Sequence, residues 1–124
     1  MILIKGGRLV TAEKSFTADI LIEGETIKAI EMHIDAPGAE VIDASGLLVM
    51  PGGIDPHVHL DLEMFDTVSS DDHYTGHKAA AFGGSTTVMV FIVQEPDIPL
   101  AESVAIWRTK AEKAAIDFGF HMNI

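Results

Sequence analysis

Cysteine is absent from the 124 residues, which excludes disulfides, thiolate metal ligands and cysteine nucleophiles. Basic residues are scarce: 8 Lys and Arg stand against 19 Asp and Glu, and the formal net charge is −11. A chain this acidic repels polyanions, so neither a nucleic acid nor an anionic membrane surface is expected as a partner. The longest apolar run, Val88–Val93, is far shorter than the roughly 20 residues that cross a bilayer.

What is present describes a folded protein. Hydrophobic residues make up 48 % of the chain and charged residues 22 %, a balance typical of globular domains rather than disordered segments. The first residues show no apolar core of a secretory signal, so a cytoplasmic location is expected.

The first fifty residues have the pattern of short strands and turns. Glycine pairs or single glycines separate short apolar segments, which predicts three hairpins in a small antiparallel sheet. The expected turns are at Gly6-Gly7, Gly24 and Ser45-Gly46.

From Pro51 onward the pattern becomes one of alternating strands and helices. Capping residues and apolar spacing predict three strands and two helices. These are a strand at 54–60, a helix that begins near Ser69–Asp72 and stops at Gly83-Gly84, a strand at 86–93, a helix at 99–118 and a strand at 120–124.

The strands start near Gly53, Thr86 and Gly119, which are 33 residues apart each time. A βα unit of that length indicates a parallel α/β sheet or a (β/α)₈ barrel. A complete barrel needs about 250 residues. Residues 51–124 supply about two and a half units, so we expect the N-terminal part of a longer protein.

The sequence His57-Val58-His59 lies near the end of the first of these strands. Residues two apart on a strand point to one face, so both imidazoles are expected to project together, with Asp55 and Asp61. Neutral imidazoles are good ligands for zinc, and barrel active sites lie at the carboxyl ends of the strands. The alternative for a bare His-x-His is a histidine pair without function on an ordinary strand.

The chain resembles the cyclic amidohydrolases of the amidohydrolase superfamily, in the dihydropyrimidinase/hydantoinase branch. The most specific matching segment is Pro51–Leu60, and four others accompany it: 4–8, 42–46, 67–72 and 76–87. The resemblance implies that residues 51–124 begin a TIM (β/α)₈ barrel of a metal-dependent hydrolase, cut off after about 2.5 units. It also implies that residues 1–50 form the N-terminal strands of a composite β-sandwich domain.

The same resemblance implies that His57 and His59 bind the more buried ion of a binuclear zinc site. In the family, a carboxylated lysine bridge, two further histidines and an aspartate complete the site, and all of them would lie beyond residue 124. No catalytic residue is therefore expected within this chain, and the 124 residues alone are expected to be inactive. The implied reaction opens a dihydropyrimidine or 5-substituted hydantoin to an N-carbamoyl amino acid, in a homotetramer when full length.

The substrate class can be narrowed by two comparisons with the family. Dihydroorotases carry an arginine just after His-x-His, where this chain has Leu60, so that activity is disfavoured; allantoinase remains an alternative. Leu62, Met64 and Phe65 match a loop that in hydantoinases packs against the exocyclic group of the substrate. The alternative is that these side chains only cover the barrel rim.

The remaining histidines are expected to be structural. His73 and His77 are four residues apart on the predicted helix and could chelate a metal, but surface positions are favoured. His121 is expected to be packed and hydrogen-bonded, and His33 exposed. A non-catalytic dihydropyrimidinase-like scaffold protein and a small metal-binding domain are the competing functions, and the presence of both His57 and His59 favours the enzyme.

Overall fold

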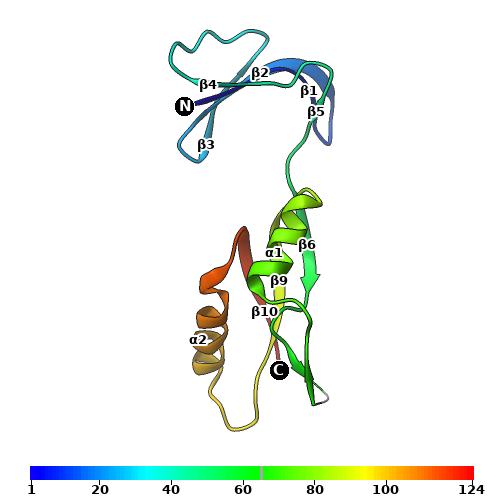
Figure 1. Cartoon of the computed structure of the whole chain (residues 1–124), viewed down its shortest axis with the longest axis vertical. Coiled ribbons are helices and arrows are strands. Elements are labelled where there is room, and N and C mark those ends of the chain that lie inside the picture. The colour runs from blue at the N-terminus through cyan, green and yellow to red at the C-terminus, as the bar shows by residue number, and fades with distance from the viewer. Residues whose placement is uncertain (65) are drawn as a thin grey trace. The chain divides into compact units, whose positions relative to one another are not determined.

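The computed structural model describes residues 1–64 and 66–124. These form two compact units, Met1–Pro51 and Gly52–Ile124. The first unit contains five strands, coloured blue to cyan in Figure 1: β1 (Ile2–Val10), β2 (Ser15–Glu23), β3 (Thr26–Glu31), β4 (Glu40–Asp43) and β5 (Leu48–Val49). The second contains β6 (Gly53–Val58), β7 (Glu63–Met64), β8 (Thr67–Val68), α1 (His73–Phe82), β9 (Ser85–Val93), α2 (Leu100–Lys110), the 3₁₀ turn η1 (Ala111–Lys113) and β10 (Asp117–Asn123).

The first unit is a mixed sheet in the order β3-β2-β1-β4, with β5 also paired to β1. The hairpin around Gly24 is confirmed, because β2 and β3 pair antiparallel on either side of it. The other two hairpins were wrong predictions. Strand β1 continues through Gly6-Gly7, and β4 and β5 both run parallel to β1 instead of pairing with each other.

A buried carboxylate explains why the chain does not turn at Gly6-Gly7. The pairing of β1 with β2 shifts register between Ile4 and Gly7, which marks a bulge, and Gly6 has a φ of 70°. Asp19, on the neighbouring strand, accepts hydrogen bonds from the backbone N–H groups of Gly6 (2.8 Å) and Ile34 (3.0 Å). These two bonds lower the pKa of Asp19, and the bond from Gly6 gives the amide at the bulge a hydrogen-bond partner.

The second unit is built on a parallel three-stranded sheet in the order β10-β9-β6. The strands begin at Gly53, Ser85 and Asp117, a spacing of 32 residues, so the predicted β-α-β-α-β order is confirmed. The second helix is shorter than predicted. It ends at Lys110. Phe118, which the prediction placed in this helix, belongs to a strand, because Asp117–Asn123 pair along β9.

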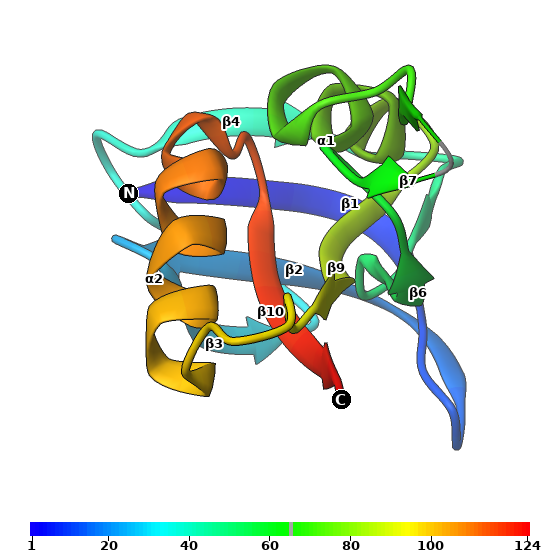
Figure 2. The same ribbon diagram turned by 90° about the horizontal axis from the view of Figure 1, so that it is seen from below.

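Both helices pack against β9 (Figures 1 and 2). Val88, Val90 and Ile92 on this strand are at most 1 % exposed. They form the core with Leu60, Leu62 and Trp107, whereas the residues between them on β9 point to the other face of the sheet. The sheet therefore has one face buried under the helices, and the alternate side chains of β9 lie on the opposite face.

Helix α1 begins and ends where the sequence predicts. Asp72 is the N-cap, and its carboxylate accepts the N–H groups of Tyr74 and Thr75. The Thr75 hydroxyl in turn accepts the N–H of Asp72, which completes a capping box, and the helix stops at Gly83.

The close approach of α1 to the segment that follows β6 gives a testable prediction. A Cβ added at Gly76 would overlap the side chain of Leu60, which is 4 % exposed and has little room to move. We expect Gly76→Ala to lower the free energy of unfolding of the intact protein by up to about 2 kcal/mol. Overpacking costs about 1–3 kcal/mol, and the better helix propensity of alanine offsets about 1 kcal/mol of that.

Urea unfolding followed by circular dichroism checks this prediction. The double variant Leu60→Ala, Gly76→Ala is expected to lose less stability than the sum of the two single variants, because the smaller side chain leaves room for the new methyl group. Strict additivity of the three measured values would contradict the proposed contact.

Candidate metal-binding site

His57 and His59 lie together at the carboxyl end of β6. Their Nε2 atoms are 3.2 Å apart, and the two rings meet edge to face with centroids 5.1 Å apart. Pro56 precedes them and has no N–H to donate to β9, and the pairing of β6 with β9 shifts register between Asp55 and Val58. The carboxylate of Asp55 instead accepts the backbone N–H of His57 at 3.1 Å. This local break in the ladder sets the direction of both imidazoles.

Aromatic side chains from the neighbouring strands lie beside the pair. Phe91 of β9 stacks on His57, with ring centroids 4.2 Å apart and an interplanar angle of 30°. His121 of β10 packs on the same phenyl ring at 4.8 Å, in agreement with the expectation that it is a packed residue. These contacts place His57, His59, Phe91 and His121 together on the face of the sheet that is not covered by the helices.

The geometry of the pair fits two ligands of one metal ion. Zinc–imidazole bonds are about 2.0–2.1 Å long, so two nitrogens on a tetrahedral ion lie about 3.3 Å apart, close to the observed separation. In residues 1–64 and 66–124 no group of three or more His, Asp or Glu side chains gathers in this way. The described part of the chain thus brings two imidazoles together, and their role as metal ligands stays a prediction.

Asp61 does not project with the imidazoles, so that prediction was wrong. Strand β6 ends at Val58, and Asp61 has a φ of 50°, in the left-handed region, which turns its side chain away from the histidine pair. Its Oδ2 accepts hydrogen bonds from the backbone N–H of His73 (2.9 Å) and from the ring Nδ1–H of the same residue (2.8 Å). Partial burial raises the pKa of Asp61, but the bonds from His73 and Lys113 outweigh this effect and lower it.

The predicted surface positions of His73 and His77 were also wrong, because both residues are fully buried. Together with the partly buried Gly76 and Ala80 they form the inward stripe of α1, at the i, i+3, i+4, i+7 spacing of a packed helix face. Small residues and histidines make this stripe weakly apolar, which is why hydrophobic periodicity alone did not identify it.

The hydrogen bonds of these two histidines disfavour a shared metal ion. Nδ1 of His73 donates to Asp61, and Nδ1 of His77 accepts the backbone N–H of Ala115 at 3.2 Å. A neutral His77 therefore carries its hydrogen on Nε2 and has no free lone pair there. Burial, and secondarily the nearby His73, lowers the pKa of His77. His33, by contrast, is exposed as expected, and its ring is 3.7 Å from the carboxylate of Asp19.

The three residues predicted to contact substrate have different surroundings. Leu62 is 9 % exposed and lies in the core, Met64 on β7 is 43 % exposed, and Phe65 lies outside the described residues. Their role in substrate binding stays a prediction, and Met64 has the exposure that direct contact with a ligand requires.

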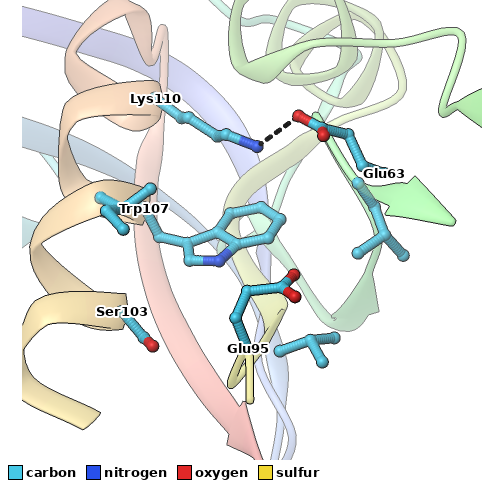
Figure 3. Close-up of a pocket in the computed structure, with 8 residues that line it drawn as sticks. Glu63, Glu95, Ser103, Trp107 and Lys110 are labelled. Atoms are coloured by element: carbon cyan, nitrogen blue, oxygen red, sulfur yellow. Dashed lines mark hydrogen bonds and ion pairs between the residues drawn. The ribbon is translucent and has the colours of Figure 1, made fainter. Parts of the chain in front are cut away.

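A cavity of about 270 Å³ lies between α2 and the segment after β6 (Figure 3). Trp107, Glu95 and Ser103 line it, and Lys110 reaches across it to Glu63, with Nζ 3.4 Å from Oε1. The ammonium group of Lys110 also lies 4.6 Å from the centre of the Trp107 ring. Neither His57 nor His59 lines this cavity.

The sequence of the chain is similar to those of known hydantoinases and dihydropyrimidinases. The chain is 49 % identical to the D-hydantoinase of Geobacillus stearothermophilus and 41 % identical to the dihydropyrimidinase of Arabidopsis thaliana, with 98 % and 99 % of its length aligned. The chain is homologous to the N-terminal part of hydantoinases and dihydropyrimidinases. It spans about a quarter of their length, 26 % and 23 % for these two relatives. No family model matches the chain.

Solved structures of hydantoinases share the fold of this chain. The D-hydantoinase of Bacillus sp. AR9 superposes with a TM-score of 0.97 at 49 % identity, over 100 % of this chain and 27 % of that one. The dihydropyrimidinase of Brevibacillus agri NCHU1002 gives a TM-score of 0.95 at 47 % identity, over 98 % and 27 %. Within the described part of the chain, no helix is long and apolar enough to cross a membrane.

The buried His77 predicts a pH-dependent loss of stability. Its pKa is lowered in the folded protein, so the unfolded chain, with a histidine pKa near 6.5, binds the proton more readily. The stabilisation is fully present above pH 6.5 and is lost as the pH falls below that value. We expect His77→Gln, which can still accept the Ala115 N–H, to show a smaller drop in unfolding free energy between pH 7.5 and 5.5 than the wild type.

Ala79→Gln is the control, because it places the same side chain on the exposed face of α1 without removing a histidine and should keep the wild-type pH dependence. Equal pH dependence in the wild type and His77→Gln, measured by urea unfolding at both pH values, would refute the assignment.

Proposed function

We propose that the protein carrying this chain hydrolyses the amide C–N bond of a cyclic ureide or amide. The ring would be a dihydropyrimidine or a 5-substituted hydantoin, and the product an N-carbamoyl amino acid. The observation that carries the proposal is the separation of 3.2 Å between the Nε2 atoms of His57 and His59 at the carboxyl end of a parallel strand. The homology to D-hydantoinases and dihydropyrimidinases supplies the reaction class.

His57 and His59 would hold a divalent metal ion through Nε2. Such an ion supplies a nucleophilic hydroxide at neutral pH and polarises the carbonyl group of the substrate. The protein contributes by holding the two rings in place. The phenyl ring of Phe91 limits rotation of the His57 ring, and the bond from the His57 N–H to Asp55 fixes the backbone that carries it.

The identity of the metal, the cellular location, the oligomeric state and the substrate contacts belong to the same proposal. Zinc is the proposed ion because imidazole ligands in tetrahedral geometry suit it, and the family resemblance suggests a binuclear site. The homotetramer rests on the family resemblance as well, and a cytoplasmic location is part of the same proposal. Leu62, Met64 and Phe65 are proposed to face the exocyclic group of the substrate, with direct contact from Met64, since Leu62 is buried in the core.

The proposed architecture is a (β/α)₈ barrel that starts near residue 51 and a β-sandwich domain to which residues 1–50 contribute. The parallel order β10-β9-β6 and the spacing of 32 residues support the barrel. Among the described residues β6 pairs only with β9 and β10 only with β9, so each has one edge that further strands could cover.

The metal ligands can be tested by substitution in the intact protein. We expect His57→Ala and His59→Ala each to lower zinc content and activity together, because each removes one imidazole ligand. The loss of activity should exceed the 10–100-fold that is typical when only a supporting partner of a ligand is removed. Metal analysis and ring opening of dihydrouracil and a 5-substituted hydantoin are the measurements.

His33→Ala is the control, since this exposed histidine lies in the other unit. Unchanged zinc stoichiometry in either His57→Ala or His59→Ala would overturn the ligand assignment. The isolated 124-residue chain is expected to open neither ring, because it contributes only two ligands; turnover by the purified chain would contradict this part of the proposal.

A further inference from the structure

The segment that follows His59 is held by an unusual number of contacts at one residue, Asp61. Its backbone N–H donates to the carbonyl of Asp71 at 3.0 Å, and its own carbonyl accepts from Nζ of Lys110 at 3.0 Å. Its carboxylate accepts the two bonds from His73 described above, and Nζ of Lys113 lies 3.3 Å from Oδ1. Every polar atom of Asp61 thus has a partner.

These partners come from four different parts of the second unit. Asp71 precedes α1, His73 is the first residue of α1, Lys110 ends α2 and Lys113 ends η1. Figure 3 shows Lys110 reaching from α2 toward this segment, where it also approaches Glu63. The position of Asp61 is therefore set by both helices at once.

The left-handed backbone of Asp61 makes these contacts necessary. A φ of 50° is uncommon for a residue with a side chain, and such a conformation persists only where the surroundings hold it. Leu60, the residue between His59 and Asp61, is buried in the core and lies against Gly76 of α1. The chain from His59 to Asp61 consequently has little freedom to shift.

The imidazole ring of His73, which binds the Asp61 carboxylate, has no exposure to solvent. Because its Nδ1–H donates to the Asp61 carboxylate, its tautomer and orientation are fixed. Trp107 and Phe118 pack around the ring, with centroid distances of 6.4 Å and 6.2 Å. A buried, packed ring is a rigid donor, which suits it to hold the carboxylate in one place.

We propose that Asp61 and His73 are positioning residues for the metal ligand His59. They fix the backbone immediately after this ligand, and thereby keep its Nε2 at the distance from His57 Nε2 that a shared ion requires. This inference rests on the proposed metal site. Metal sites tolerate little looseness in their ligands, so loss of the supporting bonds should weaken metal binding even though neither residue touches the ion.

The test uses the intact protein and two substitutions that alter this support. Asp61→Asn puts an amide donor where one carboxylate oxygen accepts from His73 or Lys113. His73→Leu removes the ring donor and keeps an apolar side chain. We expect each to weaken zinc affinity by about 10–100-fold, measured by competition with a chelator. Activity at saturating zinc should lose kcat with little change in KM.

Two readouts separate positioning from a merely structural role. In the cobalt-substituted protein, Asp61→Asn should change the visible absorption spectrum, which reports the arrangement of the ligands. His73→Gln, whose amide can donate to Asp61, should recover most of the zinc affinity lost in His73→Leu. Glu63→Gln is the control, since it removes only the exposed contact with Lys110 and should leave zinc affinity unchanged.

Lys113→Met covers the case in which the stronger variants do not fold, because this lysine is 43 % exposed and its loss should be tolerated. We expect zinc affinity to fall severalfold. If Asp61→Asn folds and keeps the wild-type zinc affinity and cobalt spectrum, the inference is overturned. If Asp61→Asn does not fold, wild-type zinc affinity in Lys113→Met overturns it instead. If His57→Ala also retains its zinc, the proposed metal site itself fails; if only the Asp61 and His73 variants retain it, the positioning role alone fails.

Discussion

The hydrogen bond between the carboxylate of Asp61 and the buried ring of His73 connects the sheet of the second unit to its helices. Hydrogen bonds to charged groups contribute about 1.5–3 kcal/mol, roughly twice the value of neutral ones. Here the bond also affects the direction of the chain after His59. It turns the chain away from the direction of β6 two residues after His59, so that His57 and His59 remain at the end of the strand.

The alternation of side chains on β9 separates the functions of the two faces of the sheet. Val88, Val90 and Ile92 supply the core beneath the helices, and Phe91, between two of them, points to the opposite face and stacks on His57. One strand thus provides both the hydrophobic support and the aromatic neighbour of the candidate ligands. Net charge has little part in this arrangement, which depends on packing and on a few local hydrogen bonds.

Much of the second unit could be predicted from the sequence because its signals are local. The capping box at Asp72, the stop at Gly83 and the apolar run of β9 each specify one element without reference to distant residues. The positions of His57 and His59 on one strand end followed from their spacing of two residues.

The errors arose where distant residues decide the outcome. Strand β1 passes through Gly6-Gly7 because the carboxylate of Asp19 satisfies the bulge, a partner that spacing does not reveal. The burial of His73 and His77 depends on Asp61 and Ala115, which are 12 and 38 residues away. The left-handed turn at Asp61 likewise depends on lysines near residue 110, about fifty residues later in the chain.

The proposed metal site requires that His57 and His59 share one metal ion. Anomalous diffraction at the zinc edge, from crystals of the intact zinc-loaded protein, tests it most directly. We expect an anomalous peak about 2.0–2.1 Å from Nε2 of both residues. A fully loaded protein with its zinc elsewhere, and with the two imidazoles hydrogen-bonded only to each other, would contradict it.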